Sequence, residues 1–149
     1  FSIIEVVLVL AIAGLIFLMV FIALPALQRN QRDTARKNDV STVASAYTTY
    51  TNNNRGTAPT NGTIDITTAF TTGDNAFKKY LADTSDNSDT VIVRDRGSLT
   101  AVAPTDGQII LTKESKCGTT PGAIAQGTKR QITVATLLEG GDAVFCQDS

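Results

Sequence analysis

A single carboxylate, Glu5, lies inside the most apolar stretch of the chain. A charged side chain among aliphatic neighbours is costly in lipid and is normally kept for a function with a specific partner. No Lys, Arg or His occurs in the first 28 residues, so the cation nearest to Glu5 in sequence is the α-amino group of Phe1. Residues 1 and 5 lie one turn apart on a helix, so Glu5 can pair with its own terminus. It can equally pair with the terminus of a neighbouring copy, or lie unpaired at a membrane surface.

The stretch that carries Glu5 is long enough to cross a membrane. From Val6 to Leu27 every residue is apolar or small, with Gly14 and Pro25 as the only interruptions. A bilayer core requires about 20 such residues, so we expect residues 1–27 to form a transmembrane helix segment. The sequence begins at Phe rather than Met and shows neither the basic region nor the cleavage site of a signal peptide. This favours a mature chain whose leader has been removed.

The first ten residues resemble the mature N-terminus of the type IV pilin family. The shared pattern is Phe1, a small hydroxyl residue, two aliphatic residues, Glu5 and then an unbroken aliphatic run, and the resemblance covers about 27 residues. It implies a structural subunit of an extracellular filament at the cell surface, with an unassembled pool in the cytoplasmic membrane. It also implies leader removal by a prepilin peptidase, N-methylation of Phe1, and alignment of Glu5 with the Phe1 amine of a neighbouring subunit. The implied partners are identical subunits, the membrane and the pilus assembly machinery.

Gly14 and Pro25 mark the weakest part of the predicted helix. Proline lacks an amide donor, and glycine is a poor residue in a helix interior. The resemblance implies that the segment between them unwinds inside a filament and lets the fibre stretch. In an unassembled subunit, the alternative is an ordinary proline kink.

Residues 28–53 are predicted to continue the helix as far as the Asn-rich run at 52–54. Positions 28–39 are polar on nearly all sides, with oppositely charged residues at helical spacing, Arg29 with Asp33 and Asp33 with Lys37. Such a face is normally solvated, or meets neighbouring subunits in a filament. From residue 40 one apolar stripe predicts packing against a sheet. Its members are Val40, Val43, Ala44, Tyr47 and Tyr50.

Two cysteines, Cys117 and Cys146, indicate an oxidising compartment and one disulfide, with two buried free thiols as the alternative. A bridge would close a loop of about 30 residues and contribute roughly 3–4 kcal/mol in the chain-entropy model. Basic residues directly after the apolar stretch point the other way, because the positive-inside rule places such residues in the cytoplasm. They are Arg29, Arg32, Arg36 and Lys37. A basic leader would restore the expected orientation.

Residues 54–149 are predicted to form a globular head. A short helix is expected at 75–81, with Phe77, Tyr80 and Leu81 facing inward. Apolar runs predict strands at 90–94, 98–102, 107–112, 130–138 and 143–146, the last two joined as a hairpin through Gly140 and Gly141. The predicted fold class is therefore α+β, with a long N-terminal helix packed on an antiparallel sheet.

The composition argues against enzymes and nucleic-acid-binding proteins. The absence of His excludes His-based catalysis and His metal sites, and 13 basic against 14 acidic residues leave no basic excess for nucleic acid. No phosphate loop, nucleophile elbow or pair of catalytic carboxylates is found, so we expect no enzyme activity, cofactor or metal. The alternating acidic run Asp83–Asp89 lacks the Gly and Glu of an EF-hand and predicts a solvated turn. Asn61-Gly62-Thr63 is formally a glycosylation sequon and equally a turn.

Two hypotheses follow. The first is a filament subunit, which includes a minor pilin or a pseudopilin of a secretion system. The second is a bitopic, membrane-anchored extracytoplasmic binding domain that never polymerises.

Overall fold

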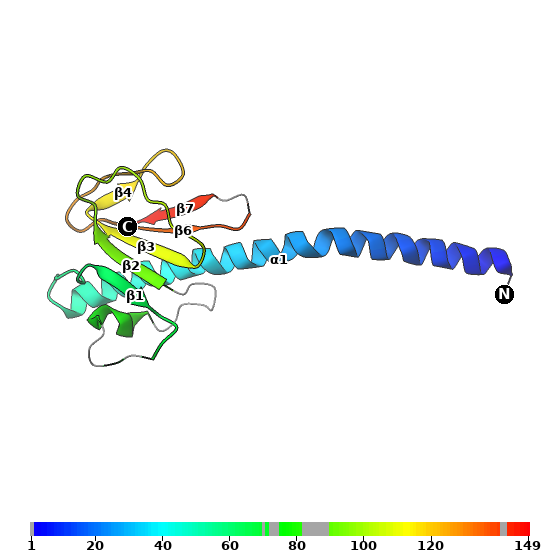
Figure 1. Cartoon of the computed structure of the whole chain (residues 1–149), viewed down its shortest axis with the longest axis horizontal. Helices are drawn as coiled ribbons and strands as arrows, with labels where there is room; N and C mark the ends of the chain where they lie inside the picture. Colours follow the sequence, from blue (N-terminus) through cyan, green and yellow to red (C-terminus); the bar gives the residue numbers. More distant parts are fainter. Residues whose placement is uncertain (1, 70, 72–74, 82–89, 141–142) are drawn as a thin grey trace.

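The computed structural model describes residues 2–69, 71, 75–81, 90–140 and 143–149. One helix, α1 (Ile3–Asn53), makes up the first third of the chain. Its 51 residues span about 75 Å at about 1.5 Å per residue. Figure 1 shows its N-terminal half leading away from the head and its C-terminal half lying along the sheet. The prediction of one unbroken helix to about residue 53 is confirmed.

The head is built on a five-stranded mixed sheet in the order β1-β2-β3-β6-β7. A separate two-stranded sheet pairs β4 with β5. The strands are β1 (Gly62–Asp65), β2 (Thr90–Asp95), β3 (Gln108–Lys113), β4 (Ser115–Cys117), β5 (Ile124–Gln126), β6 (Ile132–Leu137) and β7 (Val144–Asp148). The α+β class is thus confirmed, as is the antiparallel pairing of the last two strands, which align Leu137 with Val144. Gly141 lies outside the described residues.

The prediction of a purely antiparallel sheet is wrong, because β2 and β3 run parallel. The connection between them, residues 96–107, is about the dozen residues that a parallel crossover needs. The strand predicted at 98–102 lies in this crossover and is also wrong, since Ala101 forms only an isolated bridge with Ala123. Val102 is nevertheless buried against Ile110 on the sheet. Ser98 belongs to a turn and residues 98–101 are exposed, so only Val102 of the predicted strand packs on the sheet.

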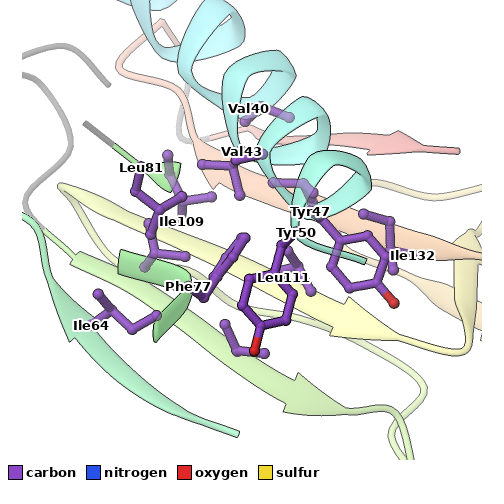
Figure 2. Close-up of a cluster of buried hydrophobic side chains, with 14 residues drawn as sticks. Val40, Val43, Tyr47, Tyr50, Ile64, Phe77, Leu81, Ile109, Leu111 and Ile132 are labelled. Atoms are coloured by element: carbon purple, nitrogen blue, oxygen red, sulfur yellow. The ribbon is translucent and has the colours of Figure 1, made fainter. Parts of the chain in front are cut away.

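The main core lies between α1 and the sheet. The predicted apolar stripe is confirmed: Val40, Val43, Tyr47 and Tyr50 are buried, and Ala44 packs beside them. Figure 2 shows the labelled side chains of α1 meeting residues from β3 and β6, together with Phe77 and Leu81. The predicted helix at 75–81 is a 3₁₀ helix, η1 (Ala76–Tyr80). The inward positions were predicted correctly: Phe77 and Leu81 are buried, and Tyr80 is partly buried.

A disulfide between Cys117 and Cys146 ties β4 to the C-terminal strand β7, with the two Cα atoms 6.0 Å apart. The predicted bridge is confirmed, and neither cysteine is free. The bridge therefore fixes the small β4–β5 sheet to the edge of the main sheet. Close by, Asp148 accepts a hydrogen bond from the Cys117 amide at 3.0 Å.

Candidate functional site

The first half of α1 exposes an unusually continuous apolar surface. Every large hydrophobic side chain from Ile3 to Leu27 is between 46% and 84% exposed. Soluble monomers rarely show a contiguous apolar patch of this extent, and larger patches mark contacts with a membrane or with protein partners. By length and composition, α1 is long and apolar enough to cross a bilayer. The predicted transmembrane segment thus has the helical form that it requires.

The helix begins with a capping box formed by Ser2 and Glu5. The Ser2 amide donates a hydrogen bond to Glu5 Oε2 at 3.0 Å, and Ser2 Oγ accepts one from the Ile4 amide at 3.3 Å. Both side chains thereby satisfy amides that the first turn of a helix leaves unpaired. This role was not predicted, although Ser-Ile-Ile-Glu matches the Ser-x-x-Glu signature of a helix start. Glu5 therefore has a structural function within a single chain.

Only one of the two carboxylate oxygens of Glu5 is used in this way. Oε2 accepts the Ser2 amide, whereas Oε1 has no hydrogen-bond partner in the part of the chain that the structure describes. The Glu5 side chain is exposed. Phe1 lies outside the described residues, so its pairing with Glu5 stays a prediction. The geometry leaves one oxygen and the negative charge available for a second contact.

Gly14 and Pro25 both lie within continuous helix. Proline cannot donate to the carbonyl of Phe21, one turn earlier, so that carbonyl lacks its usual helical partner. A Cβ atom added at Gly14 would meet no heavy atom within 4 Å. Packing within the chain therefore does not require glycine at this position. The predicted unwinding concerns the assembled filament and stays a prediction.

The exposed apolar part of α1, residues 3–27, is called the stalk. Further along the same helix, Arg36 joins α1 to the head, and this residue is only 5% exposed. Its guanidinium donates to the Leu137 carbonyl at 2.6 Å, to Glu139 Oε1 at 3.1 Å, and to Asp106. Arg32, one turn earlier, binds the other oxygen of Glu139 at 3.1 Å. Two arginines of α1 thus hold the end of β6 and the crossover loop.

Asp33 completes this junction from the same turn of α1. Its carboxylate accepts the amides of Glu139 at 2.8 Å and Gly140 at 3.1 Å. A Cβ atom at Gly140 would approach Asp33 Oδ2 to 2.7 Å, so this turn favours glycine. The prediction of a solvated face is wrong around Asp33 and Arg36, because residues about 70 to 107 positions later in the chain bind them. Periodicity within the helix carries no information about such distant partners.

Replacing Arg36 by Ala is expected to lower the free energy of unfolding of the head by about 1–3 kcal/mol. The loss follows because the Leu137 carbonyl and Glu139 would lose charge-assisted hydrogen bonds. Urea unfolding of the full chain in detergent micelles would measure the change. Arg29→Ala is the matched control, since Arg29 is exposed and makes no hydrogen bond or ion pair among the described residues. Equal stability of the two variants would contradict the assigned role.

Other candidate chemistry receives little support. The acidic run Asp83–Asp89 lies outside the described residues. Within the described ranges, no group of three or more His, Cys, Asp and Glu residues could hold a metal ion. The Asn61 amide donates to Asp95 at 2.6 Å, just before β1 begins, and this hydrogen bond is the main cause that lowers the pKa of the Asp95 carboxyl. Asn61 therefore acts in the structure as a residue that fixes the start of β1.

Comparison with protein-family models, curated proteins and solved structures finds no match to this chain. The features of the chain that bear on its function are therefore the stalk, its first turn and its junction with the head.

Proposed function

We propose that this chain is the structural subunit of a type IV pilus-like filament. The observation that carries the proposal is the exposed apolar half of α1, which continues without a break into the helix packed inside the head. Such a surface is stabilised when it leaves water, by about 25 cal/mol for each Å² of apolar area. Lipid can cover it before assembly, and the stalks of other copies can cover it afterwards. In the filament the stalks form the core and the heads form the surface.

Glu5 supports assembly over simple anchoring. In the proposed filament its charge pairs with the Phe1 amine of a neighbouring subunit. The availability of Oε1 supports this role, as does the lack of any other cation in the first 28 residues. A carboxylate near other stalks needs a partner, because an uncompensated buried charge is strongly destabilising. Pairing would therefore couple charge neutralisation to correct subunit register.

The disulfide supports a head that lies outside the cytoplasm, because disulfides persist in oxidising compartments. The basic residues that follow the apolar stretch favour the opposite orientation, with the head in the cytoplasm. This evidence is weaker than the disulfide, because carboxylates of the head pair with two of these basic residues. Arg32 and Arg36 bind Glu139, and Arg36 also binds Asp106. In this proposal a prepilin peptidase processes the precursor, and an assembly machine extracts subunits from the membrane.

Electron microscopy of fibres sheared from cells that express the precursor tests the proposal. We expect thin fibres whose subunit, identified by mass spectrometry, begins at Phe1 with a methylated amine. The precursor gene should encode a short basic leader that ends in Gly. Recovery of the chain only from membranes, at every expression level, would contradict filament formation.

The capping box favours one alternative, a bitopic membrane-anchored binding domain. Ser2 and Glu5 satisfy each other within one chain, so a helix start of this kind is useful without any neighbour. Such a protein would remain in the membrane as a monomer, and loss of the Glu5 charge would leave its distribution unchanged. A minor pilin or pseudopilin would instead co-purify with fibres in small amounts.

A further inference from the structure

A groove of about 340 Å³ is lined by residues from the last turns of α1. Figure 1 shows that this end of α1 lies at the tip of the head remote from the N-terminus. The last turns of α1 form one wall, and the turn between β5 and β6 contributes two cations. Its polar lining residues include Tyr47, Thr51, Asn52, Lys129, Arg130 and Ser149. This volume is within the range of small-molecule sites in proteins. The groove is separate from the stalk and has no part in the proposed function.

Tyr47 supplies a hydroxyl group to this groove. The residue is only 6% exposed, and its ring belongs to the main core, where Figure 2 shows it on the last turns of α1. Within the described residues its hydroxyl makes no hydrogen bond. The hydroxyl is not among the fully buried side-chain atoms, so it opens onto the groove and can donate a hydrogen bond to a ligand there. Burial, and secondly the charge of Glu114, raise the pKa of Tyr47 above its ordinary value.

Lys129 and Arg130 supply two positive charges. Both are exposed, and neither makes a hydrogen bond or an ion pair with any residue that the structure describes. The charge of Glu114, which acts on Tyr47, offsets part of this positive charge. The hydroxyl of Thr51 is already used, since it donates to the carbonyls of Tyr47 and Thr48. The groups left for a ligand are therefore chiefly donors and cations.

We propose that this groove binds a small organic anion whose phosphate or carboxylate group lies between Lys129 and Arg130 and whose remaining oxygens reach Tyr47. Arginine and lysine are the side chains that favour these anions, by forked hydrogen bonds and as a point charge respectively. A free metabolite or acidic sugar can supply the group, and so can an acidic side chain of a second copy. Both sources supply the same anionic group, and two experiments distinguish between them.

Isothermal titration calorimetry of the full chain in detergent micelles tests the free ligand. The probes are inorganic phosphate, glucose 6-phosphate and glucuronate, with glucose as the neutral comparison. We expect saturable binding of the anions, at least tenfold tighter than that of glucose. The double variant Lys129→Ala/Arg130→Ala should weaken this binding at least tenfold, and Tyr47→Phe should weaken it about 2- to 10-fold. Lys116→Ala, at an exposed lysine outside the groove, should leave it unchanged.

Carbodiimide treatment of the protein in phosphatidylcholine vesicles tests the second source. This reagent joins the Lys129 amine to a carboxylate as an amide with loss of water. If Lys129 forms a cross-link to another copy, and if phosphate suppresses this cross-link, the anion comes from that copy. Absence of both saturable binding and the cross-link would overturn the proposal. An equal loss of affinity in Lys116→Ala would also overturn it.

Discussion

Replacing Glu5 by Gln is expected to abolish filaments while leaving the whole of α1 folded, including its first turn. A glutamine side chain can still accept the Ser2 amide, because the capping box functions with either Glu or Gln. What the substitution removes is the negative charge that would pair with a neighbouring Phe1 amine. The fraction of subunits in sheared fibres, measured against the fraction in membranes, would show the effect. We expect a near-complete loss from the fibre fraction and full retention in the membrane.

Two matched variants separate the cap from the charge. Ser2→Ala removes the capping hydroxyl and keeps the carboxylate, so the helix start should lose about 0.5–2 kcal/mol while fibres persist. Glu5→Ala removes both functions and should resemble Glu5→Gln in the assembly assay. Wild-type amounts of fibre from Glu5→Gln would assign Glu5 to the cap alone. That outcome would favour the bitopic membrane anchor.

The long helix was predictable because its signals are local. An apolar run, no breaker other than Pro25, and an apolar stripe from Val40 to Tyr50 together placed it within a residue or two at its C-terminal end. The inward positions of Phe77 and Leu81 were predictable for the same reason. The disulfide was predictable because two cysteines allow a single intramolecular pairing.

Sheet order and the stalk–head junction were not predictable, because both depend on contacts between distant residues. Strands β1, β4 and β5 have three or four residues each, too few to show a clear alternation. The parallel pairing of β2 with β3 depends on the path of the crossover, which local sequence does not specify. The polar stretch at 28–39 predicts a solvated face or a contact with neighbouring subunits, and not the burial of Arg36, because its partners Asp106 and Glu139 lie 70 and 103 positions away.

The junction gives the stalk a defined direction relative to the head. Arg32, Asp33 and Arg36 lie within about one and a half turns of α1 and all bind the region around Glu139. A filament needs such a connection, because the position of each head in the lattice follows from the position of its stalk. A membrane anchor has no comparable requirement. The junction is therefore better explained by the filament than by the bitopic domain.

Phe77→Ala is expected to lower the free energy of unfolding of the head by about 3–5 kcal/mol. The side chain is fully buried and meets Tyr50 edge to face, with ring centroids 5.6 Å apart. Truncation removes the transfer free energy of the ring, leaves a cavity and breaks an aromatic pair. Urea unfolding followed by tyrosine fluorescence would measure the change in detergent micelles. Phe77→Leu, which retains most of the volume, should lose clearly less.

Phe17→Ala applies the same truncation to the stalk. Comparing it with Phe77→Ala distinguishes the role of the stalk from that of the head. Phe17 is 66% exposed and lies far from the core, so head stability should change by less than about 0.5 kcal/mol. In the proposed filament, however, Phe17 is buried among neighbouring stalks, and its loss should reduce the yield of fibres. Phe77→Ala should instead lower the stability of the head and leave the stalk unaffected. The protein should still insert into the membrane, while its head unfolds readily. Equal effects of the two variants on head stability would contradict the division of the chain into an exposed stalk and a packed head.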